Sequence, residues 1–213
     1  MESTDLTVWG VGTSRTMRVH WMLLELGLEY ECHPIQSRTG ETHTDEFKRL
    51  NPRHKIPVLR HGSLVVTESA AIIQYLSETF ADSTKIHVPN DAVSRAKLNE
   101  WCYFIISELD AGSLYVIRRH EGLKQIYGAA PNAVESARSS FLHNLAAMAT
   151  RIGGDNTYLC GAQLSAADIL LMTSLDWAVA CGIAVPETVS RYRQRVALRP
   201  AYQAALKKNF VTY

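Results

Sequence analysis

The chain has 213 residues, 46% of them hydrophobic, which is typical of a globular protein that buries a core and argues against a disordered one. Lysine and arginine total 22 against 21 acidic residues without a long run of either sign, so no concentrated basic face indicates binding to nucleic acid or to a membrane surface. The four cysteines and eight histidines lack metal-ligand spacing, and we recognise neither a secretory signal nor a membrane-spanning run, so we expect a cytoplasmic protein without a metal.

The first eighty residues alternate between strand-like and helix-like patterns. In chain order they predict a strand at 6–9, a helix at 15–26, a strand at 30–35, a short helix at 44–50, strands at 57–60 and 64–67, and a helix at 69–79. Gly27 is placed as the C-cap glycine of the first helix. The predicted order is therefore β-α-β-α-β-β-α.

From Asp91 onward the sequence has helical spacing almost throughout. About five helices fit between the glycine and proline separators. These separators are Gly112, Gly128 with Pro131, Gly153 with Gly154, Gly182 with Pro186, and Pro200. The sequence thus predicts an α/β domain at 1–80, a linker at 81–90 and an all-helical domain at 91–213.

Ser165 and Asp168 form a predicted capping box inside the helical domain. The Ser165 hydroxyl would accept from the Asp168 amide, and the Asp168 carboxylate from the Ser165 N–H. Losing such a cap costs about 1 to 2 kcal/mol. We therefore assign Asp168 a role in folding and none in catalysis.

Thr13-Ser14-Arg15-Thr16 stands at the turn between the first strand and the first helix. Taken alone, it is best interpreted as a plain N-cap, because a hydroxyl oxygen there satisfies an otherwise unpaired helix N–H. The functional interpretation is that a hydroxyl, with the positive end of the helix dipole behind it, donates a hydrogen bond to an external thiolate and lowers the thiol pKa.

Pro57 opens a strand that should be buried. A trans proline would only mark the start of the strand, since proline cannot donate to a ladder. If the Ile56–Pro57 bond is cis, the chain turns so that the N–H and C=O of Ile56 face outward and can pair with a peptide as an added strand would.

Glu68-Ser69 ends the second strand of the hairpin and opens the next helix. Alone, it is best interpreted as another N-cap. Functionally, the free N–H groups and the hydroxyl at this helix N-terminus suit a carboxylate, while Glu68 suits the ammonium of the same amino acid.

Together these segments resemble the glutathione S-transferases over nearly the whole chain. The resemblance rests on the order of the N-terminal elements, the Lys-Ile-Pro-Val-Leu strand, Glu68-Ser69, the linker, and the Ser165-x-x-Asp168 box. Residues 40–47 also resemble the phi and related bacterial serine-type members. The resemblance implies a thioredoxin-like N-terminal domain with a mixed four-stranded sheet, an all-helical C-terminal domain, glutathione as co-substrate and a homodimer.

The resemblance also implies a role for individual residues. Ile56, with Pro57, would hold the cysteinyl part of glutathione, and Glu68 and Ser69 the γ-glutamyl part. The glycine carboxylate would lie near Thr42, His43 and Lys55.

The family activates the thiol with a Tyr, Ser or Cys near the first turn. Neither Tyr nor Cys lies between Gly10 and Arg18, which leaves Ser14 as the favoured hydroxyl. Thr13 is the alternative, because a one-residue shift of the turn exchanges them, and Arg15 and the dipole are possible helpers. Lowering a thiol pKa of about 8.5 by about two units converts most of the thiol to thiolate at neutral pH.

A small hydrophobic electrophile should bind to the first long helices of the second domain. The candidates for this pocket are Trp101, Phe104, Ile105, Glu108 and Tyr115. The simpler interpretation, that the apolar residues among them are core, accounts for most of them.

The preferred function is glutathione transfer to such an electrophile. The alternatives in the same fold are a glutathione-dependent isomerase, dehalogenase or peroxidase, and a non-catalytic protein that binds glutathione or another ligand.

Overall fold

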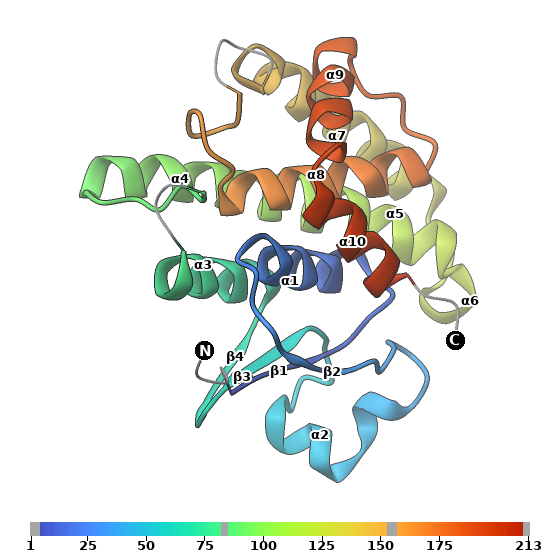
Figure 1. Cartoon of the computed structure of the whole chain (residues 1–213). Helices are drawn as coiled ribbons and strands as arrows, with labels where there is room; N and C mark the ends of the chain where they lie inside the picture. Colours follow the sequence, from blue (N-terminus) through green and yellow to red (C-terminus); the bar gives the residue numbers. More distant parts are fainter. Residues whose placement is uncertain (1–4, 82–84, 153–156, 211–213) are drawn as a thin grey trace. The chain divides into compact units, whose positions relative to one another are not determined.

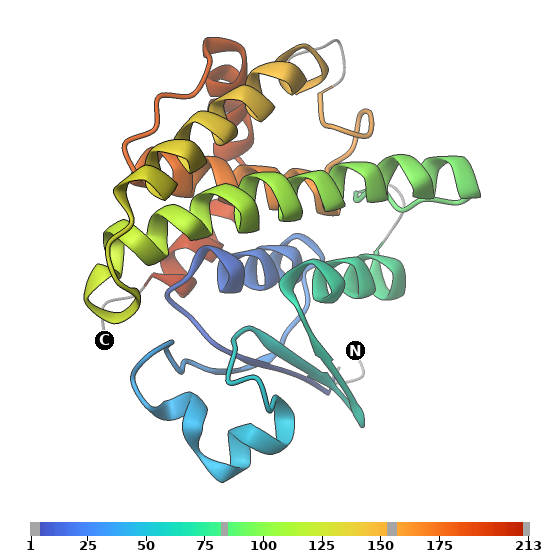
Figure 2. The same cartoon turned by 180° about the vertical axis from the view of Figure 1, so that it is seen from behind.

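The computed structural model of the chain describes residues 5–81, 85–152 and 157–210. It divides into two compact units, drawn in Figures 1 and 2. The first unit is Met1–Val88 together with Leu198–Tyr213, and the second is Pro89–Ala197. The predicted linker, 81–90, spans the boundary after Val88, and its residues 82–84 lie outside the described residues.

The first unit is built on a mixed four-stranded sheet in the order β2-β1-β3-β4. Strand β1 (Leu6–Trp9) is buried along its whole length and pairs with β2 (Glu31–His33) in parallel and with β3 (Val58–His61) in antiparallel orientation. Strand β4 (Leu64–Thr67) completes the hairpin with β3. The predicted thioredoxin-like order and the mixed sheet are confirmed.

Helices cover both faces of this sheet (Figures 1 and 2). Helices α1 (Ser14–Glu25) and α3 (Ser69–Phe80) pack on each other on one face, and α3 also contacts β3 and β4. Helix α1 is buried from Thr16 to Leu23, and α3 buries Ile72, Ile73 and Leu76. The short helix η1 (Glu41–His43) leads into α2 (Asp45–Leu50) on the other face. The sheet thereby holds the N-termini of α1 and α3 within one unit.

The last described helix, α10 (Pro200–Asn209), belongs to the first unit and packs on α1 (Figure 1). The rings of Trp21 and Tyr202 meet edge to face at 5.0 Å. The Arg199 guanidinium donates to both oxygens of the Glu25 carboxylate, at 2.6 and 2.7 Å. The sequence analysis kept residues 91–213 in one domain because all of them have helical periodicity. Periodicity identifies a helix, but it does not identify the element against which the helix packs.

All the named elements in the described part of the second unit are helices, joined by loops. Its elements are α4 (Ala92–Phe104), η2 (Ile105–Leu114), α5 (Tyr115–Ile117), η3 (Arg118–Gly122), α6 (Lys124–Tyr127), α7 (Pro131–Ile152), α8 (Ala166–Ala180) and α9 (Glu187–Ala197). Helix α8 is apolar and buried nearly all round, as expected of a central helix. None of the helices in the described residues is long and apolar enough to cross a membrane.

Gly112 does not separate two helices, contrary to the prediction. It lies inside η2, a stretch of wide π-helical turns. A Cβ at this position would lie 2.8 Å from the carbonyl oxygen of Ser107, so the missing side chain makes room for the wide turn instead of ending the helix. The predicted separator at Gly153 and Gly154 lies outside the described residues.

The predicted capping box at the start of α8 is confirmed. The fully buried Asp168 carboxylate accepts hydrogen bonds from the Ser165 N–H and hydroxyl, from the Leu159 N–H and from the Tyr192 hydroxyl, at 2.6 to 2.8 Å. Burial raises the pKa of Asp168, and these donors oppose that effect. The box therefore also ties α9 and the loop before α8 to the core of the second unit.

Candidate functional site

The N-terminal turn of α1 separates the roles of Thr13 and Ser14. Thr13 is the N-cap: its hydroxyl accepts from the Thr16 N–H at 3.0 Å, and its own N–H donates to the Thr16 hydroxyl at 3.0 Å. Ser14 is the first helical residue, is half-buried, and has no hydrogen-bond partner for its hydroxyl among the described residues. Because Thr13 performs the capping, the Ser14 hydroxyl remains available to an external group.

The charge environment of this turn suits an anion. The first turn of α1 contains no acidic residue, so nothing on the helix offsets the positive end of its dipole. Arg15 is half-buried beside Ser14 and adds a cation to the same turn.

The Ile56–Pro57 peptide bond is cis, the form on which the functional interpretation of this segment depends. The Ile56 side chain is held in a small apolar cluster with Trp9, Phe47 and Val58. Its main-chain N–H and C=O make no hydrogen bond within the described residues. An anchored side chain and an open main chain suit pairing with a bound peptide.

Gly10 brings the turn of residue 14 and the prolyl turn together. Its φ is +116°, and a Cβ at this position would lie 2.6 Å from the Ile56 Cβ and 2.9 Å from the Thr16 Cγ2. Only glycine allows both the backbone conformation and this approach. The segments before α1 and before β3 therefore meet at residue 10.

A buried histidine, His20, holds the backbone of Gly10 in place. His20 donates through Nε2 to the Gly10 carbonyl at 2.9 Å and accepts through Nδ1 from the Tyr30 hydroxyl at 2.8 Å. Burial lowers the pKa of His20 to about 4. The imidazole is therefore neutral near pH 7, and this single tautomer satisfies both partners.

The N-terminus of α3 carries a strained residue, Glu68, with φ of 68° and ψ of 115°. Non-glycine residues in such conformations cluster at functional sites. Its exposed carboxylate pairs with the Arg53 guanidinium at 2.8 Å, and Arg53 also donates to the Thr67 hydroxyl at 2.9 Å. Sequence reasoning did not select Arg53, and no local pattern marks it.

The next residue, Ser69, is buried and accepts a hydrogen bond at 3.1 Å from Arg18, a fully buried arginine of α1. A guanidinium only donates, so the proton of the Ser69 hydroxyl is free to be donated to another acceptor. Arg18 also brings positive charge beneath the N-terminus of α3. Both effects favour a carboxylate at this point.

The η1 segment meets the prolyl segment through two histidines. The rings of His43 and His54 stack with their centroids 4.4 Å apart, and His54 donates through Nδ1 to the carbonyl of the buried Thr42 at 2.7 Å. Lys55 is exposed next to them. Sequence reasoning missed His54, although its position two residues before Ile56 is a usable signal.

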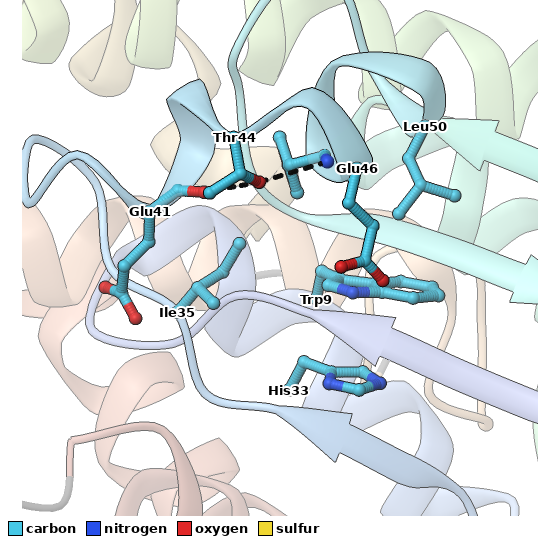
Figure 3. A pocket seen from close by; sticks show the side chains of 8 residues that line it. Trp9, His33, Ile35, Glu41, Thr44, Glu46 and Leu50 are labelled. Carbon is cyan, nitrogen blue, oxygen red and sulfur yellow. Dashed lines mark hydrogen bonds between the residues drawn. The ribbon is translucent and has the colours of Figure 1, made fainter.

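A cavity of about 250 Å³ lies between α2 and the ends of β1 and β2 (Figure 3). The rings of Trp9 and His33 stack on one side of it, 4.9 Å apart, and Phe47 and Leu50 of α2 also line it. None of the predicted site residues lines this cavity. Trp9 and Phe47 instead belong to the cluster that anchors Ile56.

The residues predicted for the electrophile pocket lie on α4, η2 and α5 of the second unit. Trp101 and Ile105 are buried, and the Arg151 guanidinium lies 4.4 Å from the Trp101 ring centroid. Phe104 and Tyr115 are half-buried, and Glu108 is exposed. Trp101 and Ile105 are therefore core residues, whereas Phe104, Glu108 and Tyr115 remain accessible.

Two family models match the chain. The model of the glutathione S-transferase N-terminal domain matches residues 4–78, and that of the glutathione S-transferase C-terminal domain matches residues 104–200.

Individual proteins are also similar to the chain. Glutathione S-transferase 2 of Anopheles gambiae is 29% identical over 196 residues, which are 89% of this chain and 88% of that protein. Protein LigF of Sphingobium sp. (strain NBRC 103272 / SYK-6) is 39% identical over 83 residues, which are 39% of this chain but only 32% of LigF. A theta class glutathione S-transferase from the citrus canker pathogen Xanthomonas axonopodis pv. citri, solved with glutathione bound, has a TM-score of 0.77 at 22% identity, covering 99% of both chains.

Proposed function

The chain belongs to the glutathione S-transferase family, and from this premise we propose that it binds glutathione on its first unit and activates the thiol for attack on a small hydrophobic electrophile. The observation that carries the proposal is the Ser14 hydroxyl, which has no partner among the described residues, stands at the N-terminus of α1, and is joined through Gly10 to the prolyl turn of Ile56.

Each part of the tripeptide has a matching group. The main chain of Ile56 would pair with the cysteinyl residue, as a strand does. At the γ-glutamyl end, the Ser69 hydroxyl and the α3 N-terminus suit the carboxylate, and Glu68 suits the ammonium. His43 and Lys55 offer donors to the glycine carboxylate, next to Thr42.

Glu68 must change partner when glutathione binds in this way. Its carboxylate is now paired with Arg53 at 2.8 Å, and the ammonium of glutathione would compete for it. Both side chains are exposed, so exchanging one exposed pair for another costs little.

In this proposal the Ser14 hydroxyl donates a hydrogen bond to the thiolate of glutathione. This bond and the dipole of α1 both favour the charged form of the sulfur, which lowers the thiol pKa. The thiol proton goes to solvent, and the sulfur then forms a bond to the electrophilic carbon. An aryl halide loses its halide ion in this step, whereas in an isothiocyanate the C=N electron pair moves to nitrogen, which takes up a proton from solvent. Thr13 is the weaker candidate, because its oxygen already accepts from the Thr16 N–H.

The electrophile would bind on the second unit near Phe104, Glu108 and Tyr115, the accessible members of the predicted set. Their mixture of aromatic surface and one carboxylate fits a mostly apolar ligand with few polar groups.

The test is binding and turnover with the purified full chain. Calorimetry should detect the binding of glutathione to the chain. Assays with a panel of aryl halides, isothiocyanates and organic hydroperoxides should detect product that forms only when glutathione is present. Product analysis distinguishes conjugation from isomerisation, which returns free glutathione, and from peroxidase activity, which yields glutathione disulfide. Absence of both glutathione binding and turnover across the panel would refute the proposal.

A further inference from the structure

Asn209, the last residue of α10, is almost completely buried against the N-terminal turn of α1. It makes three hydrogen bonds to that turn. The Gly12 N–H donates to the Asn209 carbonyl at 2.8 Å, the Thr16 hydroxyl donates to Asn209 Oδ1 at 2.7 Å, and Asn209 Nδ2 donates to the Thr13 carbonyl at 3.0 Å.

These three bonds surround Ser14. They reach the residue two positions before it, the residue directly before it and the residue two positions after it, while the Ser14 hydroxyl has no partner of its own among the described residues. Thr13 and Thr16 are also the two members of the capping box. The direction of the Ser14 side chain therefore depends on a box that Asn209 holds from outside the helix.

Asn209 is itself held firmly. The ring contact of Tyr202 with Trp21 and the paired hydrogen bonds of Arg199 to Glu25 fix α10 along α1. A short amide side chain at the end of a docked helix has little freedom, so its donor and acceptor meet the turn in one geometry.

We propose that Asn209 is a positioning residue for the thiol chemistry: it fixes the turn of residues 12–16 so that the Ser14 hydroxyl faces the sulfur of bound glutathione. The inference rests on the proposed function. Asn209 does not touch glutathione in this scheme and acts only through the turn. Its loss should therefore affect the activated sulfur and leave binding of the tripeptide, which depends on Ile56, Glu68 and Ser69, almost unchanged.

The experiment compares the wild-type chain with Asn209→Ala. The thiol pKa of bound glutathione is read from thiolate absorbance against pH, and kcat and KM for glutathione are measured with an electrophile that the wild type turns over. We expect the thiol pKa to rise by about one unit and kcat below that pKa to fall about tenfold, since each unit changes the thiolate fraction about tenfold. KM for glutathione should stay within about twofold.

Two controls separate positioning from general stability. Asp168→Ala removes buried hydrogen bonds in the second unit and none at the turn, so it should lower the melting temperature and leave the thiol pKa unchanged. Lys207→Ala changes an exposed residue of α10 and should alter neither the melting temperature nor the thiol pKa. If Asn209→Ala does not fold, Asn209→Asp takes its place; it keeps an acceptor for Thr16 but cannot donate to the Thr13 carbonyl, and it should also raise the thiol pKa.

A wild-type thiol pKa in the Asn209 variant would overturn the inference, and so would an equal rise of the thiol pKa in Asp168→Ala. Failure of the proposed function has a different signature. In that case the wild type itself does not bind glutathione, or Ser14→Ala has the same thiol pKa as the wild type, and the inference fails with it.

Discussion

Ile56 approaches the backbone of Gly10 so closely that a methyl group at residue 10 would lie 2.6 Å from the Ile56 Cβ. This contact joins the turn before α1 to the cis prolyl turn.

Gly10→Ala should therefore destabilise the chain by about 2 to 4 kcal/mol, the sum of a forced contact and a positive φ on a residue with a Cβ. Gly40→Ala is the matched control, because Gly40 has a φ of +93° but nothing within 4 Å of the added Cβ; it should cost about 1 kcal/mol. Denaturant unfolding measures both. Equal losses would show that the approach of Ile56 contributes nothing.

Ser14→Ala and Thr13→Ala should have opposite signatures. Ser14→Ala removes the proposed partner of the sulfur and should raise the thiol pKa of bound glutathione and lower kcat by about tenfold to a hundredfold, with little change in melting temperature. Thr13→Ala removes the N-cap and should cost about 1 kcal/mol of stability while retaining most of the turnover. Steady-state kinetics and thermal unfolding of both variants test this assignment. If Thr13→Ala lost turnover and Ser14→Ala lost stability, Thr13 would be the residue that activates the thiol.

His20 should make the free energy of unfolding depend on pH. The pKa of His20 is about 4 in the folded chain against 6.5 for an ordinary histidine, so the unfolded chain takes up a proton first as the pH falls. Stability should therefore be lost between about pH 6.5 and pH 4, by about 3 kcal/mol in total, with no further loss from this group below that range.

The variant His20→Gln should lack this part of the pH dependence, and His143→Gln, an exposed histidine of α7, should retain it. Denaturant curves at pH 7 and pH 4.5 provide the comparison. An identical pH dependence in wild type and His20→Gln would contradict the neutral, doubly bonded imidazole.

Asp168→Ala should destabilise the second unit by about 3 to 5 kcal/mol, because it leaves several buried donors without an acceptor. Asp91→Ala is the control, since Asp91 caps α4 in a similar box on the exposed surface and should cost only about 1 kcal/mol. Calorimetric unfolding of both variants tests the difference. Comparable losses would mean that Asp168 acts only as a local cap.

Local features of the fold were predictable from the sequence. The strands near 6–9 and 64–67, a helix cap within residues 13–16, the cap at residue 165, and the hairpin all follow from patterns within a few residues. Pro57 at the head of a buried strand also pointed to a cis bond as one of two options, and the structure has the cis form. These features depend on local dihedral preferences and hydrogen bonds, which short segments of sequence encode.

Contacts between distant segments were not predictable in this way. Nothing in the pattern of α1 indicates that Arg18 meets Ser69, or that Asn209 reaches Thr13. Periodicity shows which side of a helix is buried but not against which element, and the separator assigned to Gly112 failed because the wide turns of η2 depend on packing. The sequence was thus enough to propose segments for the candidate site, whereas the contacts between those segments could not be predicted from it.

The return of α10 to the first unit also affects how the chain reaches its native state during synthesis. The whole of Pro89–Ala197 is an insertion between two pieces of one folded body. The ribosome therefore has to complete the inserted part before the helix that bonds to Gly12, Thr13 and Thr16 exists. A nascent chain that ends before residue 198 carries an unfinished first unit.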